Sequence, residues 1–127
     1  MADEIKYTER EAQLKFAGDL FTDVWKLLEK KNRTEAEDDE MVNAAHASLH
    51  FWTQFGKPKN LATGHWQVSR VYSVLKRPEP ALYHAKKCLE ICEKNKISEN
   101  EFDIAWAYEA IAAAYAAKAQ LVKEKKK

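Results

Sequence analysis

A helix-start signal occurs three times in this sequence. Each copy is a hydroxyl residue followed three positions later by glutamate. This is the capping box, in which the two side chains satisfy free amide groups of a first helical turn. The copies are Thr8 to Glu11, Thr34 to Glu37 and Ser98 to Glu101. Segments that alternate apolar and polar residues, and hairpin turns such as Asn-Gly, are absent from the sequence. We therefore expect an all-α fold.

Apolar residues at steps of three and four give each of the first two expected helices one buried face. The first helix is expected over 8–31, with a stripe of Leu14, Ala17, Phe21, Val24 and Leu28. The second begins at the Thr34 box, with a stripe of Met41, Ala45, Ser48, Trp52 and Phe55. It is expected to end at Gly56 in a left-handed conformation, with Pro58 as a stop.

Prolines and caps define three further helices. The third is expected to begin near Asn60 as its cap and to run through Trp66, Val68, Val71, Tyr72 and Leu75 to a turn at 77–80. Pro80 suits the first turn of the fourth, whose stripe is Ala81, Ala85, Cys88 and Cys92. The fifth is expected from Glu99 to about Val122, with a stripe of Ile104, Tyr108, Ile111 and Tyr115 and with alanines elsewhere.

The 127 residues suffice for one domain that buries a core without disulfides or a metal. We expect a disordered or frayed N-terminus at 1–7, a single helical domain at 8–122 and a charged C-terminal tail at 123–127. Cys88 and Cys92, four residues apart on one expected helix, are predicted to be reduced core residues. Because the sequence has neither a secretory signal nor a membrane-spanning stretch, we expect a cytoplasmic protein.

Charge and motifs exclude several classes of function. Lysine and arginine number 21 against 20 aspartates and glutamates, so the basic surface of a nucleic-acid or membrane binder is not expected. The sequence also lacks a Gly-rich phosphate loop and a Gly-flanked serine nucleophile. We therefore expect no enzymatic activity and no cofactor.

The third and fourth expected helices resemble a tetratricopeptide repeat (TPR), as found in small TPR-like proteins. The similarity is carried by Val68-Ser69, Tyr72, the proline-containing turn, Ala81, Ala85 and Cys88-Leu89. The fifth helix restarts the pattern at Ile111-Ala112 and Tyr115, 43 positions after Val68, and Ala17-Gly18 with Phe21 can be aligned in the first. The resemblance implies five antiparallel helices, arranged as a right-handed array of helical hairpins with a C-terminal capping helix.

This resemblance also implies a function. In TPR proteins the first helices of successive hairpins line a concave groove, where peptides or partner proteins bind. The positions that the alignment places in or beside this groove are Trp66, Arg70, Ser73, Trp106 and Glu109, with Lys15 and Asp19 on the first helix. The resemblance therefore predicts a non-enzymatic protein or peptide interaction module.

Alternatives to this interpretation stay open. Tryptophans at helical spacing often fill a core, which suits Trp106 because it flanks the expected stripe. His46 and His50 could bind a metal or small ligand in a five-helix bundle, with a third ligand such as His65 or His84, or they could be structural. The alanine-rich fifth helix could pair with a second copy of the chain and form a homodimer.

Overall fold

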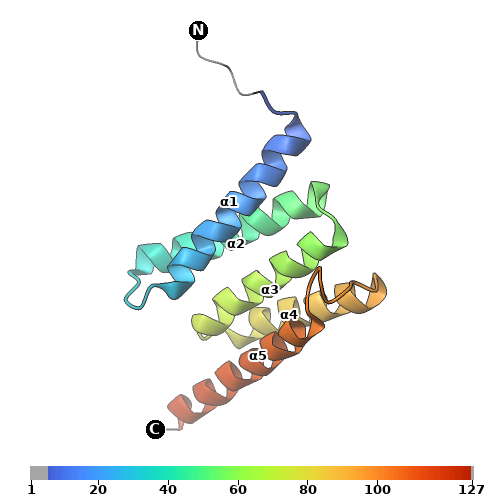
Figure 1. The fold of residues 1–127 in the computed structure, drawn as a ribbon. Helices are drawn as coiled ribbons and strands as arrows, with labels where there is room; N and C mark the ends of the chain where they lie inside the picture. Colours follow the sequence, from blue (N-terminus) through green and yellow to red (C-terminus); the bar gives the residue numbers. More distant parts are fainter. Residues whose placement is uncertain (1–5, 127) are drawn as a thin grey trace.

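The computed structural model describes residues 6–126, and over that range it is helical, without strands. Its five helices are α1 (Glu9–Glu29), α2 (Glu35–Phe55), α3 (Pro58–Val74), α4 (Pro78–Lys94) and α5 (Ile104–Lys125), as Figure 1 shows. The all-α prediction with five helices is confirmed. Of the expected N-terminal segment 1–7, residues 1–5 lie outside the described residues. In the described range, no helix has the length and apolar character needed to cross a bilayer.

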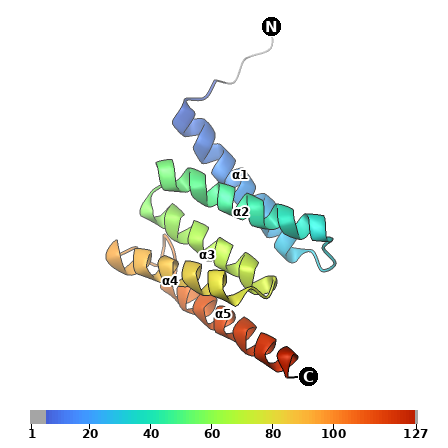
Figure 2. The same ribbon diagram turned by 180° about the vertical axis from the view of Figure 1, so that it is seen from behind.

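The helices stack in chain order. Each packs against the next, and α3 also contacts both α1 and α5. Within residues 6–126, α5 touches neither α1 nor α2, so the stack is open rather than closed into a bundle. Figure 1 shows α1, α3 and α5 on the near side with α2 and α4 behind them, and Figure 2 shows the reverse. The stack therefore has one face built from α1, α3 and α5.

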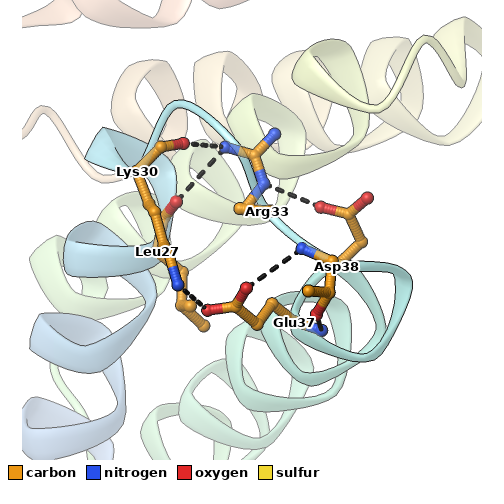
Figure 3. A network of polar contacts seen from close by, with 6 residues as sticks. Leu27, Lys30, Arg33, Glu37 and Asp38 are labelled. Carbon is orange, nitrogen blue, oxygen red and sulfur yellow. Dashed lines mark hydrogen bonds and ion pairs between the residues drawn. The ribbon is translucent and has the colours of Figure 1, made fainter.

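The first two capping boxes form as predicted. Thr8 and Thr34 cap α1 and α2, and each exchanges hydrogen bonds with the glutamate three residues later. Figure 3 shows how the turn between these helices is fixed. The Arg33 guanidinium donates hydrogen bonds to the carbonyl oxygens of Leu27 and Lys30 at the end of α1, and to a carboxylate oxygen of Asp38 in α2. The same side chain thus holds the end of one helix and the start of the next.

The predicted end of α2 at Gly56 is confirmed but the left-handed conformation predicted there is wrong, and so are the predicted starts of α3 and α5. Gly56 ends α2 with φ −78°, which is extended rather than left-handed; glycine is needed there because a Cβ atom would lie 2.6 Å from the Trp52 carbonyl oxygen. Pro58 starts α3 instead of only stopping α2, and Asn60 accepts a hydrogen bond from the Lys57 amide at the third helical position. The Ser98 box forms only a turn, and α5 starts after Asp103, whose carboxylate accepts from the Ala105 amide.

Three buried polar side chains join helices through backbone carbonyl groups. Ser48 of α2 donates to the Ala17 carbonyl oxygen in α1 at 2.8 Å. Gln67 and Ser69 of α3 donate to the carbonyl oxygens of Phe21 in α1 and Ala81 in α4, at 2.9 and 2.7 Å. Because buried polar groups are costly unless they are hydrogen-bonded, these contacts favour one register between neighbouring helices.

The apolar stripes predicted for α2 and α4 are mostly buried, whereas the stripe predicted for α5 is not the buried face of that helix. Cys88 and Cys92 are buried and free, and burial raises the pKa of both thiols, as expected for reduced core cysteines. On α5 the buried residues are Ala107, Ala110, Ala114 and Ala117. Tyr108 and Tyr115, which periodicity predicts in the core, are 54% and 49% exposed. Small side chains let α5 lie close to α4, so the tyrosines point outward.

Candidate functional site

Three tryptophans from three helices make contact on the face formed by α1, α3 and α5. The Trp66 ring of α3 stacks on Trp25 of α1, with centroids 5.8 Å apart. Trp66 also meets Trp106 of α5 at 5.3 Å, and Phe102 packs edge-on against both Trp66 and Trp106. Trp25 is 39% and Trp106 is 46% exposed. We call Trp25, Trp66 and Trp106 the tryptophan ladder. Its two ends are open to solvent.

Trp106 is not a core residue, because nearly half of its surface is exposed. Phe102 occupies the core instead, with 4% exposure, in a cluster with Ala62, Cys88, Cys92 and Ala107. Residues 98–102 form a turn instead of the first turn of α5. This turn places Phe102 in the core, where it packs edge-on against Trp66 and Trp106. Trp66 lies between the two environments and is partly buried.

Polar side chains lie one and two turns beyond Trp66 on α3. Arg70 and Ser73 are both partly buried, and the Arg70 Nε and Ser73 Oγ atoms are buried without a hydrogen-bond partner in the described part of the chain. Glu109 is exposed on α5. Lys15 and Asp19 are exposed on α1 and form an ion pair with each other at 2.6 Å. Arg70 is thus the one cation of the predicted groove set that is partly buried and has an unsatisfied donor.

The sequence interpretation missed one member of the ladder. Trp25 is absent from the predicted groove residues, although the three tryptophans are separated by 41 and 40 residues in the sequence. That near-constant spacing is the signal that could have identified it. The alignment on small residues obscures this signal, because it gives a period of 43 for the third and fifth helices and does not superimpose the tryptophans.

A second cluster, of three histidines and a tyrosine, joins α2, α3 and α4. The Nδ1 atoms of His65 and His84 lie 2.9 Å apart, and the Nε2 atom of His46 lies 2.7 Å from the Tyr72 hydroxyl oxygen. The His84 ring also contacts the rings of His46 at 5.6 Å and Tyr72 at 6.2 Å. We call His46, His65, His84 and Tyr72 the histidine cluster.

The histidine cluster favours uncharged imidazoles. Burial lowers the pKa of His65 to about 4, and positive charge on Lys87 and His46 adds to this effect. Burial, together with His65 and His46, lowers the pKa of His84 to about 4. The pKa of His46 is lowered by burial and by Arg77, whose guanidinium lies over the Tyr72 ring. At neutral pH the cluster is a hydrogen-bonded group of neutral rings.

The predicted pairing of His46 with His50 does not form. His46 faces Tyr72 and His84, whereas His50 is exposed and its Nε2 atom is hydrogen-bonded to Gln54 on its own helix. Sequence spacing could not separate the two histidines because residues four apart share a helix face, but the neighbouring helix covers only one end of that face. Residues 6–126 contain no group of three His, Cys, Asp or Glu side chains placed to hold a metal ion.

A hollow of about 490 Å³ lies away from the tryptophan ladder and borders the histidine cluster through Arg77, whose guanidinium lies over the Tyr72 ring. It is formed by the turn between α3 and α4 and the C-terminal half of α5, and its lining includes Arg77, Leu82, Tyr115 and Lys118. None of the ladder residues borders it.

A scan against protein-family models and searches of curated proteins and of solved structures found no match to this chain.

Proposed function

We propose that this chain is a TPR-like, non-enzymatic interaction module that binds a protein or peptide segment along the face of α1, α3 and α5. One observation carries the proposal: on that face the tryptophan ladder joins three helices that are far apart in the sequence, and both of its ends remain exposed. Large aromatic side chains supply much contact area at little entropic cost, which is why they are enriched in binding hot spots.

The packing order supports a TPR-like arrangement. In a stack of helical hairpins, the first helices of successive hairpins contact one another, and each second helix fills in behind them. The contacts of α3 with α1 and α5, and the position of α2 and α4 behind that row, are those expected of such a stack (Figures 1 and 2). In this assignment α1 and α2 form one hairpin, α3 and α4 the next, and α5 closes the array.

Arg70 gives the proposed groove a preference for an acidic ligand. Its Nε atom has no hydrogen-bond partner in residues 6–126, and a guanidinium can donate two parallel hydrogen bonds to a carboxylate. Arg70 follows Trp66 by one helical turn, so both side chains can contact one ligand segment. An extended peptide with an apolar or aromatic side chain next to an aspartate, a glutamate or a terminal carboxylate matches these two features.

The proposal is tested with peptides selected from a random displayed library on the wild-type protein. Dissociation constants of the selected peptides are then measured by fluorescence anisotropy. We expect Trp106→Ala and Arg70→Gln each to weaken binding roughly tenfold or more, while thermal melts stay close to wild type.

Tyr83→Ala is the matched control, because Tyr83 is an exposed aromatic residue on α4, on the opposite side of the stack. Its binding should equal that of wild type. Unchanged affinity in Trp106→Ala and Arg70→Gln, or lost affinity in Tyr83→Ala, would move the binding surface elsewhere and refute the proposal.

A further inference from the structure

Helix α5 is apolar on two opposite faces. One face carries the buried alanines at 107, 110, 114 and 117. The other carries six exposed residues at alternating steps of three and four, namely Ala105, Tyr108, Ala112, Tyr115, Ala119 and Val122. That spacing is the a/d seam of a coiled coil. Because all six residues are exposed, this apolar outer seam lacks a partner in the described chain.

The composition of the seam is complementary to itself in one orientation. When two copies of the seam run antiparallel, with position 112 of one copy opposite position 115 of the other, every large residue faces a small one. Tyr115 then meets Ala112, Tyr108 meets Ala119, and Val122 meets Ala105. The a positions of the seam are Ala105, Ala112 and Ala119, and these small side chains let the two helix axes approach closely. A parallel pairing would instead set tyrosine beside tyrosine.

Charges beside the seam favour the same orientation. Glu109 flanks its N-terminal half and Lys123 flanks its C-terminal half, and both are exposed. An antiparallel pair brings Glu109 of one copy to the same side as Lys123 of the other. Helical side chains lean toward the N-terminus of their own helix, so these two lean toward each other. A parallel pair would separate Glu109 of one copy from Lys123 of the other by about 21 Å along the helices, so that these charges could not pair.

We propose that the outer seam of α5 binds a second copy of this chain, antiparallel across a two-fold axis, to form a symmetric homodimer. The seam spans residues 105–122 and is about 27 Å long. An interface of one helix from each copy lies at the small end of specific protein interfaces, so the dimer exchanges with monomer and is sensitive to single substitutions.

Mass measurement by sedimentation or light scattering across a concentration series tests the dimer. The chain has a mass of 14.7 kDa, and the measured mass should rise toward twice that value. Ala112→Arg places a charge at the centre of the seam, and we expect dimerisation to weaken roughly tenfold or more. Ala36→Arg is the matched control because Ala36 is an exposed alanine on α2, and it should dimerise like wild type.

Orientation is tested with single cysteines under mild oxidation. In the proposed register the two copies of position 112 are offset by about 5 Å along the helices, whereas those of position 105 are offset by about 26 Å. Ala112→Cys should therefore cross-link and Ala105→Cys should not. Wild-type protein, whose cysteines are buried, gives the background.

A charge exchange tests the register independently. Glu109→Lys and Lys123→Glu should each weaken the dimer, and the double variant should restore it. A monomeric mass at millimolar concentration would overturn the proposal and leave the seam to a different partner. Equal cross-linking of Ala105→Cys and Ala112→Cys, or no recovery in the double variant, would overturn the antiparallel register.

Discussion

The Nδ1 atoms of His65 and His84 lie 2.9 Å apart, so one imidazole donates a hydrogen bond and the other accepts it. This arrangement requires at least one of the two rings to be neutral, because two protonated Nδ1 atoms would face each other without an acceptor. The pair joins α3 to α4, and His46 extends the cluster to α2. The middle of the stack is therefore sensitive to protonation.

Acid should destabilise the fold through the histidine cluster. In the unfolded chain these histidines take up protons near pH 6.5, whereas in the folded state the pKa values of His65 and His84 are about 4. Between these values the unfolded state binds more protons, so the free energy of unfolding falls as the pH drops from about 6.5 to about 4. One histidine shifted this far corresponds to about 3 kcal/mol and two to about 6 kcal/mol. Because both rings are partly exposed, solvent screening reduces this sum, and we expect a total loss of roughly 3 kcal/mol or more, measured by urea denaturation across this range.

A double variant separates this effect from general acid denaturation. His65→Asn together with His84→Asn should be less stable than wild type at pH 7 but should lose much less stability between pH 6.5 and pH 4. An equally steep loss in the variant would assign the acid sensitivity to other groups.

Two glycines should respond to alanine in opposite directions. Gly18 lies inside α1, and no atom lies within 4 Å of the place that a Cβ would occupy, so Gly18→Ala should stabilise the protein by about 1 kcal/mol through helix propensity. In Gly56→Ala the new Cβ would lie 2.6 Å from the Trp52 carbonyl oxygen, and we expect a loss of roughly 2 kcal/mol. Thermal and urea melts of both variants check the pair, and a gain at Gly56 would contradict the close approach there.

Glycine should also improve two helix ends. Lys76 and Lys96 have φ 60° and 50°, a left-handed conformation in which side chains other than glycine are strained, and both follow a helix that ends in the same hydrogen-bond pattern. We expect Lys96→Gly to stabilise the protein by about 1 kcal/mol. Lys76→Gly should gain less because it also removes the exposed ion pair with Glu124. Denaturant midpoints measure both, and destabilisation in Lys96→Gly would be inconsistent with the left-handed end.

Arg33 should matter more than an exposed ion pair. It donates to two carbonyl groups of α1 and to Asp38 of α2, and its side chain is largely buried (Figure 3). Arg33→Ala should cost roughly 2 kcal/mol, because hydrogen bonds to charged groups are lost while their acceptors remain. Lys15→Ala, which breaks the exposed pair with Asp19, should leave the urea midpoint nearly unchanged. If Arg33→Ala and Lys15→Ala changed the urea midpoint equally, Arg33 would not stabilise the turn between α1 and α2.

Local signals predicted the helices well where the chain determines them by itself. The boxes at Thr8 and Thr34 act through hydrogen bonds within four residues, so they could be read directly from the sequence. The prediction that the Ser98 box starts a helix was wrong because tertiary packing overrides the local signal. Phe102 is buried in the core, and the chain forms a turn before α5 begins at Ile104. The prediction of which face of α5 is buried was wrong for a related reason. Its alanines are buried because α4 packs closely, which periodicity alone could not decide.

The candidate sites followed the same division. Trp66 and Arg70 could be linked because they are one turn apart on a helix. The contact of Trp66 with Trp25, and of His84 with His46, depends on how helices from different parts of the chain are stacked. The sequence gave no means of excluding His50 from the histidine cluster. His50 lies on the same helix as His46 but contacts different residues.

The most direct test of the proposed binding face uses the indole N–H signals of the four tryptophans in a proton–nitrogen NMR titration with a library-selected peptide. Trp52 of α2 is buried against Phe21 of α1 and next to Gly64 of α3, so it serves as an internal control. We predict that the signals of Trp25, Trp66 and Trp106 shift on peptide addition while that of Trp52 stays in place. A saturating peptide that leaves all three ladder signals unmoved would contradict the account.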